Sequence, residues 1–251
     1  MSTAALVGWG GHDPELRDAD VQAVVMDCTE RVRVRLLEAI DSHAPLVVWG
    51  PYGSGKTFAA ARACEHALDL VDADVRYLRL PKTSQGRGLY RAILEQLLTQ
   101  PVSSGLTETQ LMYDLNDVLT ERERILVIDE THRMSRGSQE ALQNLVDLPG
   151  TLATFVLLGD ETMPRALLPE LWSRAGARVE FHRLADDEVV GVLAEMHPLF
   201  AASDPDLLRR LNRRFARGEL RRWAKLLARA LRYDIGTAIE LEHVDVLCED
   251  H

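Results

Sequence analysis

The sequence lacks the features that would assign the chain to a membrane, secreted or zinc-binding class. No run of about 18 apolar residues occurs, so no segment is predicted to span a membrane. Residues 1–11 have neither a basic region nor a long apolar core, which argues against a secretory signal. The cysteines Cys28, Cys64 and Cys248 form no C-x-x-C pair, which favours reduced thiols in the cytoplasm. The histidines form no i, i+4 pair, so no zinc site is predicted.

Charge is unevenly spread along the chain. The net charge is −10, but residues 203–234 contain ten basic and four acidic residues, a net charge of +6. The other residues carry 19 basic and 35 acidic side chains, a net charge of −16. Such asymmetry indicates a surface that faces nucleic acid or an internal sensor of an anion, although basic helices packed on an acidic neighbour would also produce it.

A glycine-rich segment at residues 50–57 is the most specific motif of the chain. It fits G-x-x-x-x-G-K-[ST] and lies between an apolar run at 46–49 and a helix-forming stretch at 58–63. Glycines let backbone N–H groups approach phosphate oxygens, a lysine supplies positive charge, and a threonine hydroxyl can bind Mg²⁺. The segment therefore predicts a site for a nucleoside triphosphate. Its contact residues would be Gly50, Gly53, Ser54, Gly55, Lys56 and Thr57.

An acidic pair follows the second strong apolar run. Residues 125–128 are all aliphatic, as expected for a strand buried on both faces of a parallel sheet, and they end in Asp129 and Glu130. Ligands bind at the carboxyl ends of such strands. Asp129 is predicted to hold Mg²⁺, and Glu130 to polarise the water that attacks the γ-phosphate. The pair therefore favours hydrolysis of ATP over binding alone.

Strand and helix patterns alternate along most of the chain. Strands are expected at 46–49, 75–80, 125–128, 152–158 and 178–181, and helices at 21–40, 58–70, 89–99, 108–120 and 138–146. Alternation of this kind predicts an α/β fold with a parallel five-stranded sheet covered on both faces. After residue 184 only two or three helices are expected, so we predict a helical lead-in (1–44), a P-loop domain (45–184), a helical lid (185–233) and an acidic tail (234–251).

The motifs together resemble those of an AAA+ ATPase, and within that class the group that contains the Mu B transposition protein, TnsC, TniB and the ExeA ATPases. A strand between the two site motifs and a glutamate after Asp129 resemble the additional-strand, catalytic-glutamate branch of P-loop ATPases. The likeness extends from about Thr29 to Leu231. It rests on 29–31, the 50–57 loop, 79–83, 88–90, 128–134, 140–145, 157–160, Leu171-Trp172-Ser173-Arg174 and Gly218-Glu219-Leu220-Arg221-Arg222.

This resemblance implies an assembly of subunits, as a ring or a helical filament, with nucleotide at the subunit interface. Arg174 resembles the arginine finger that reaches a neighbour's γ-phosphate, and Arg178 is the nearby alternative for this role. Arg174 could instead be a surface arginine in an ordinary salt bridge. Arg221 resembles the second-sensor arginine of the lid, with Arg222 beside it. Two residues are candidates for the first sensor, which usually ends the fourth strand: Thr154 within the apolar run and Asp160 just past its end. An acidic Asp160 at that position departs from the usual Asn or Thr and predicts slow hydrolysis.

The resemblance also implies partners. In the transposition ATPases, the loop after the second strand touches the DNA backbone. Here it holds Lys82, Thr83 and Arg87, whose cations and hydroxyl suit phosphate contacts without sequence readout. Double-stranded DNA and a transposase are therefore the expected partners, and ATP with Mg²⁺ the expected cofactors. The acidic tail offers a contact for a basic transposase.

Other classes fit less well or remain open. No Asn-Lys-x-Asp motif occurs, which argues against a Ras-like GTPase, and 251 residues cannot supply the two RecA-like lobes of a DEAD/DEAH-box helicase. The open alternative is an ExeA-like ATPase that uses ATP to assemble a protein scaffold and makes no DNA contact. Salt-sensitive, sequence-independent DNA binding would distinguish the two.

Overall fold

The protein consists of two compact units. A computed structural model of the chain describes residues 27–78, 80 and 86–248. In this part of the chain, the first unit holds residues 28–50 and 56–180, and the second holds residues 51–55 and 181–248. Among the described residues, every helix is too short or too polar to cross a lipid bilayer.

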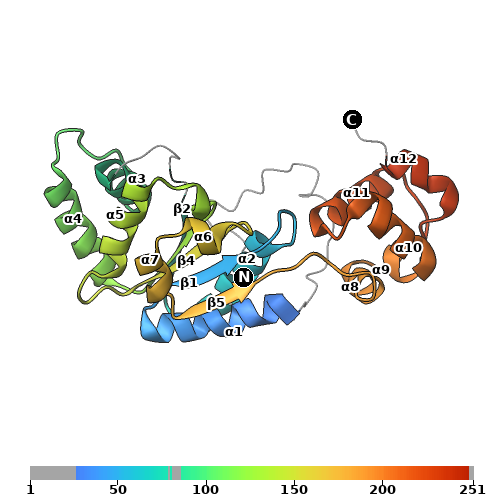
Figure 1. Cartoon of the computed structure of the whole chain (residues 1–251), viewed down its shortest axis with the longest axis horizontal. Helices are drawn as coiled ribbons and strands as arrows, with labels where there is room; N and C mark the ends of the chain where they lie inside the picture. Colours follow the sequence, from blue (N-terminus) through green and yellow to red (C-terminus); the bar gives the residue numbers. More distant parts are fainter. Residues whose placement is uncertain (1–26, 79, 81–85, 249–251) are drawn as a thin grey trace. The chain divides into compact units, whose positions relative to one another are not determined.

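The first unit is built on a sheet of five parallel strands in the order β2-β3-β4-β1-β5 (Figure 1). The strands are β1 (Leu46–Trp49), β2 (Asp74–Leu78), β3 (Arg124–Ile128), β4 (Ala153–Gly159) and β5 (Ala177–Glu180). Every residue of β3 and β4 is buried, as the aliphatic runs predicted for strands covered on both faces. The predicted α/β fold with a five-stranded parallel sheet is confirmed, with strand ends shifted by one or two residues.

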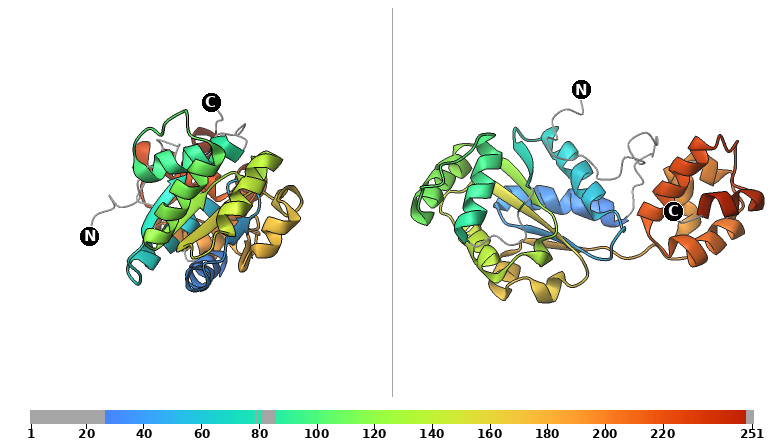
Figure 2. Two further views of the ribbon diagram at one scale, coloured as in Figure 1. Left: turned by 90° about the vertical axis from the view of Figure 1, so that its left-hand side faces the viewer. Right: turned by 90° about the horizontal axis from the view of Figure 1, so that it is seen from above.

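Helices cover both faces of this sheet (Figure 2). They are α1 (Asp27–Ser42), α2 (Lys56–Leu68), α3 (Gly86–Leu98), α4 (Glu108–Glu121), α5 (Arg136–Val146), α6 (Met163–Ala166) and α7 (Pro169–Arg174). Alternate residues of the strands, such as Leu126, Ile128, Phe155 and Leu157, pack in one apolar cluster with α3, α4, α5 and α7. The buried residues of α2 lie outside that cluster. The period-2 pattern of the strands therefore divides the core into two layers.

Local capping sets where two of these helices begin. Thr107 caps α4, and its side chain accepts from the Gln110 backbone N–H while the Gln110 side chain reaches back to Thr107. Ser135 caps α5 by accepting from the Ser138 N–H, so that helix begins at Arg136, two residues before the predicted start. Ser138 therefore does not begin the helix; it lies in the first turn, where its N–H binds the capping residue Ser135.

The second unit is helical. It contains α8 (Val189–Met196), α9 (Pro198–Ala201), α10 (Pro205–Leu211), the π-helical turn η4 (Asn212–Ala216), α11 (Leu220–Arg232), η5 (Leu241–His243) and α12 (Val244–Cys248). Its core packs around Trp223, whose ring meets Phe200 edge-on at 5.6 Å between centroids. The unit holds more helices than the two or three expected after residue 184.

The core of this unit also continues past residue 233, where the sequence suggested a boundary between lid and tail. Ile239 and Leu247 are almost completely buried in the same apolar cluster as Trp223. Both lie among acidic residues, so the composition of the segment conceals their packing. The described part of the predicted tail is therefore packed on the helices that precede it.

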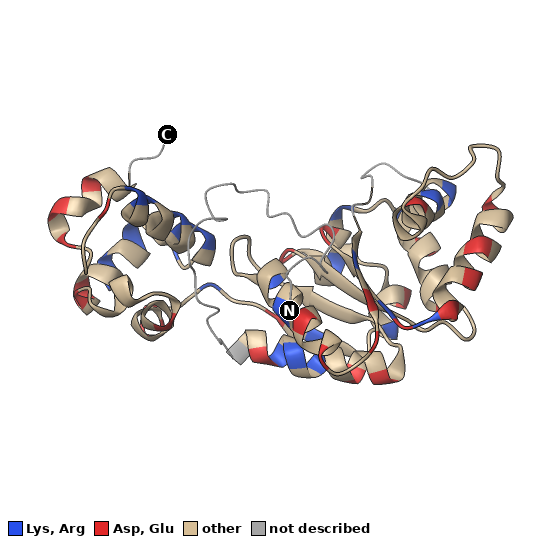
Figure 3. Ribbon diagram, turned by 180° about the vertical axis from the view of Figure 1, so that it is seen from behind, with Lys and Arg blue, Asp and Glu red and all other residues tan. Residues whose placement is uncertain are grey.

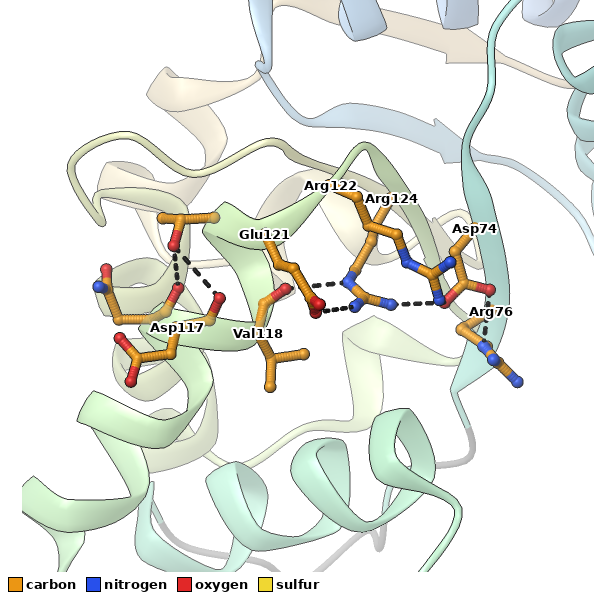
Figure 4. Close-up of polar contacts among 9 residues, drawn as sticks. Asp74, Arg76, Asp117, Val118, Glu121, Arg122 and Arg124 are labelled. Carbon is orange, nitrogen blue, oxygen red and sulfur yellow. Dashed lines mark hydrogen bonds and ion pairs between the residues drawn. The ribbon is translucent and has the colours of Figure 1, made fainter.

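A buried charge cluster fixes the amino-terminal ends of β2 and β3 (Figure 4). Arg124 is only 4% exposed, and its guanidinium contacts the Asp74 carboxylate at 2.5 Å and the Val118 carbonyl at 3.0 Å. Arg76 and Arg122 contact the same carboxylate at 2.9 and 3.2 Å. Asp74 and Arg124 are direct partners in the strand register. Glu121 of α4 lies 3.5 Å from the Arg124 guanidinium. Asp74 is thus the nearest counterion of the buried arginine, and the Arg124 guanidinium joins the strand pair to α4.

We predict that Asp74→Ala lowers the free energy of unfolding by about 3–5 kcal/mol, because the buried Arg124 loses its nearest carboxylate and keeps only the exposed Glu121 at 3.5 Å. Asp72→Ala removes an exposed carboxylate two residues earlier and is the matched control. Urea unfolding measures both values. If Asp74→Ala costs no more than Asp72→Ala, the cluster does not stabilise the sheet.

Candidate functional site

The glycine-rich segment links β1 to α2 through a turn that only glycine adopts readily. Gly53 and Gly55 have φ angles of +72° and +93°, in the left-handed region where a side chain would be strained. Lys56 is the first residue of α2, and its Nζ donates to the Gly50 carbonyl at 2.8 Å. Helix α2 therefore points its amino terminus at the turn, an arrangement that favours an anion.

Asp129 follows β3 and accepts hydrogen bonds from three groups. Thr57 Oγ1 donates to Asp129 Oδ2 at 3.1 Å, and the Tyr77 hydroxyl donates to the same oxygen at 2.7 Å. The Glu130 backbone N–H donates to Oδ1 at 2.8 Å. The carboxylate is therefore held in a fixed orientation beside the threonine of the glycine-rich segment, 72 residues away in sequence.

Glu130 has a left-handed backbone with φ of +56°, an uncommon conformation for a residue with a side chain. Such strain is concentrated at functional sites. Glu130 precedes the short helix η3 (Thr131–Arg133), and its carboxylate pairs with Arg133 at 2.9 Å. The carboxylate is about one-third exposed, so a water molecule can reach it.

Asp160 follows β4 and contacts the loop after β3. Its backbone N–H donates to His132 Nδ1 at 3.2 Å, and its Oδ2 lies 3.2 Å from His132 Nε2. Burial works against the charged form, but hydrogen bonds from Thr162 and the charges of His132 and Lys56 hold the pKa of Asp160 below its usual value. Asp160 is therefore an anion near Lys56.

The order of the strands explains why these residues meet. β4 lies between β1 and β3, and the register pairs Trp49 with Gly159 and Leu157 with Ile128. The residues that directly follow these strands are therefore neighbours at one edge of the sheet. Thr154 lies near the start of β4 and is completely buried, and its side-chain hydroxyl has no hydrogen-bond partner among the described residues. Asp160, which directly follows the strand, is therefore the one of the two that lies at the carboxyl end of β4.

This set of groups fits a nucleoside triphosphate with Mg²⁺. A threonine hydroxyl and a carboxylate are the hard oxygen ligands that Mg²⁺ prefers, and it commonly binds through few protein ligands together with phosphates. The glycine turn leaves backbone room for phosphate oxygens, and Lys56 supplies a cation. Thr57 and Asp129 would hold the ion, which neutralises phosphate charge when bound.

The two candidate finger arginines have partners within the first unit. Arg174 ends α7, is about half exposed, and its Nε lies 2.7 Å from Asp147 Oδ1, a hydrogen bond that lowers the pKa of the Asp147 carboxyl. Arg178 donates to the Trp172 carbonyl at 2.6 Å and lies over the Trp172 ring, 4.9 Å from its centroid. Of the two, Arg174 has only a half-exposed ion pair, which a phosphate can displace more easily.

In the second unit, Arg221 and Arg222 differ in their surroundings. The Arg221 backbone N–H donates to the Gly53 carbonyl at 3.2 Å, and its exposed guanidinium lies 6.0 Å from the Tyr52 ring centroid. Arg222 is bound to Glu219 at 3.0 Å and to the Phe215 carbonyl at 2.7 Å. Arg221 therefore lies beside the turn residues 51–55, which belong to the same unit.

Of the three candidate DNA contacts, the structure describes one. Arg87 lies on α3, exposed, and donates to the Ser104 carbonyl at 2.5 Å. Lys82 and Thr83 lie outside the described residues.

Sequence reasoning missed two residues of the site. Tyr77 lies on β2, which is adjacent to β3, and only the strand order shows that its hydroxyl reaches Asp129. His132 lies on η3, its side chain is 9% exposed, and it contacts Asp160 after β4. Its sole sequence signal is its position two residues after Glu130.

The AAA domain family matches residues 40–167, just over half of the 251 residues. A search of curated proteins finds no significant match. Among solved structures, the chain is similar to the ORC2 protein of Aeropyrum pernix in its ADPNP–ADP complexes. The identity is 16% over 93% of this chain and 70% of that chain, with a TM-score of 0.68.

Two further solved structures are similar. The Aeropyrum pernix ORC1 protein in complex with DNA is 22% identical, over 90% of this chain and 65% of that chain, with a TM-score of 0.65. The RuvB Holliday junction branch migration motor of Thermotoga maritima is 19% identical, over 88% and 67% of the two chains, with a TM-score of 0.55.

The chain spans about two thirds of the length of these structures, and at such identities the likeness shows a shared AAA+ fold. The family match covers more than half of the chain and includes the glycine-rich segment and the acidic pair. The chain therefore belongs to the AAA domain family.

Proposed function

We propose that this protein is an ATP-dependent, oligomerising AAA+ regulator that binds DNA without sequence preference and assists a DNA transposase in selecting or activating its target. It resembles in this respect the group of Mu B, TnsC and TniB. The observation that carries the ATPase part of the proposal is the meeting of Lys56, Thr57, Asp129 and Asp160 at the carboxyl ends of three adjacent strands.

Several side chains of the first unit have separate roles in the proposed hydrolysis. Lys56 exchanges its bond to the Gly50 carbonyl for phosphate oxygens, and Thr57 and Asp129 hold Mg²⁺. Glu130 leaves its exposed pair with Arg133 and orients the attacking water as a general base. Asp160 repels phosphate oxygens, because its pKa is lowered and it stays charged. We infer from this repulsion that turnover is slow.

Assembly is proposed to complete the site. Arg174 acts in trans on the γ-phosphate of a neighbouring subunit in a ring or filament. Its guanidinium is half exposed and exchanges the Asp147 carboxylate for a phosphate at little cost, since exposed ion pairs contribute about 0–1 kcal/mol. Arg221 acts in cis from the start of α11, where its backbone is bonded to the turn of the glycine-rich segment.

The DNA and transposase part of the proposal rests on likeness. Of two similar structures, one is described as a complex with DNA and one as a Holliday junction motor. The loop residues Lys82, Thr83 and Arg87 are proposed to contact the phosphate backbone.

We further propose that the P-loop domain is 45–184 and the lid 185–233, with a lead-in before and an acidic tail after them, and that the protein works in the cytoplasm.

A second candidate is an ExeA-like ATPase that uses the same site to switch a protein scaffold. The negative charge of the chain outside residues 203–234 favours this alternative, because an acidic surface repels DNA. The two candidates share the ATPase site and differ only in whether ATP drives assembly on DNA.

We expect Lys56→Ala to abolish ATP binding and Glu130→Gln to retain it while slowing turnover by about 10²–10⁴-fold, the range for loss of a general base. Equilibrium binding of a fluorescent ATP analogue and release of phosphate measure the two quantities. Glu140→Gln, which changes an exposed carboxylate on α5, is the matched control. Equal turnover by Glu130→Gln and the wild type would show that Glu130 is not the base.

We expect Tyr77→Phe to raise the Mg²⁺ concentration that supports half-maximal turnover by about tenfold, because loss of a partner that orients a metal ligand typically weakens metal affinity by about 10–100-fold. Tyr113→Phe removes the same hydroxyl from an exposed site on α4 and should leave the Mg²⁺ dependence unchanged. An unchanged Mg²⁺ dependence for Tyr77→Phe would remove Asp129 from the proposed metal site.

A further inference from the structure

The helical segment α10–η4 carries four exposed arginines in a row. Arg210, Arg213, Arg214 and Arg217 are all exposed, and we call this set the arginine ridge. Arg210 lies in α10, Arg213 and Arg214 lie in the π-helical turn η4, and Arg217 follows that turn with a left-handed backbone. The ridge thus brings four like charges together within eight consecutive residues.

Few carboxylates neutralise the ridge. Arg213 pairs with Asp186 at 2.5 Å, whereas Arg214 and Arg217 form no ion pair with any described residue. Nearby acidic residues have other partners, because Asp206 pairs with Arg209, and Glu219 pairs with Arg183 and Arg222. Arg210 shares a shallow groove with Asp204 and Glu240, so its charge is partly offset.

A buried polar network holds the backbone of the ridge in place. Asn212 is 4% exposed, and its Oδ1 accepts from the Gly218 N–H at 3.1 Å and from Trp223 Nε1 at 3.2 Å. Its Nδ2 donates to Asp186 Oδ1 at 3.0 Å. Arg217 has a left-handed backbone with φ of +52°, and its carbonyl accepts from Arg183 at 3.1 Å. Because the backbone of the ridge is ordered before a ligand binds, the conformational entropy lost by the protein on binding is mainly that of the arginine side chains.

The ridge lies in the basic region of a chain that is otherwise acidic. Figure 3 shows the basic residues of this unit gathered along α10 and α11, and acidic residues toward α12 and the segment before α8. Residues 203–234 carry +6, and the rest of the chain carries −16. A polyanion can therefore approach here, while most of the remaining surface repels it.

We propose that the arginine ridge binds the sugar–phosphate backbone of duplex DNA. This proposal rests on the proposed function and adds a surface of the second unit to the loop proposed above. Guanidinium groups donate paired hydrogen bonds to phosphate oxygens and stay charged at every physiological pH. Phosphates follow one another about every 3.4 Å of helix axis along one strand, so several guanidinium groups on one short segment can contact successive phosphates. Contacts to phosphates fix position and carry no sequence information.

The test uses the full-length chain and a fluorescently labelled random-sequence duplex, with ATP and Mg²⁺ present. The ridge variant combines Arg214→Gln with Arg217→Asn, since asparagine tolerates the left-handed backbone at position 217. Each lost phosphate contact makes the slope of log K against log salt concentration less negative by about 0.9. The ridge variant should therefore lose about 1.8 of slope per bound subunit and bind about tenfold more weakly at moderate salt.

The control variant carries Arg35→Gln and Arg62→Gln. These two arginines of the first unit are 52% and 53% exposed, and their loss changes net charge by the same amount. The control should keep the wild-type slope and affinity, and all variants should keep ATP binding and their melting temperatures. If the wild type binds DNA and the ridge variant matches the control, the ridge is not the DNA surface, and the proposed function stands. If the wild type binds no DNA in any nucleotide state, both proposals fail.

Discussion

The order of the parallel strands is the constraint on which the candidate site depends. Because β4 separates β1 from β3, the residues that follow these three strands meet at one edge of the sheet. The strand order alone therefore brings the glycine turn, the Asp129 carboxylate and Asp160 together. Helix α2 begins at this edge, so the amino end of a helix dipole and Lys56 face the same space. At the opposite edge, Asp74 and Arg124 hold β2 and β3 in register.

Much of this fold and part of the site follow from sequence, because the determining patterns are local. Four aliphatic residues in a row predict β3, and the glycines of the G-x-x-x-x-G-K-T motif predict the turn that follows β1. Tyr77 and His132 could not be assigned, since their roles depend on which strands are neighbours in space. Likewise, Ile239 and Leu247 are isolated apolar residues in an acidic segment, and only tertiary packing shows that they complete the core around Trp223.

The second unit combines an ordered interior with an uneven surface. Asn212 joins the segment before α8, the turn at Gly218 and the indole of Trp223 through buried hydrogen bonds. The same few residues fix the start of α11, where Arg221 lies, and the backbone of the arginine ridge. Buried polar groups of this kind specify one arrangement, because every alternative leaves a donor or acceptor unsatisfied. The proposed nucleotide sensor Arg221 and the proposed DNA-binding ridge therefore share one ordered backbone.

The central claim is that ATP controls assembly of this chain on DNA. The most direct test is the sedimentation of the wild-type protein with ATP, with ADP and without nucleotide, each in the presence and absence of duplex DNA, at low and moderate salt. Our account predicts large complexes that contain DNA only in the presence of ATP and that weaken as salt rises. Assembly with ATP that ignores DNA would contradict it and favour the protein scaffold, and a monomer in every condition would contradict both.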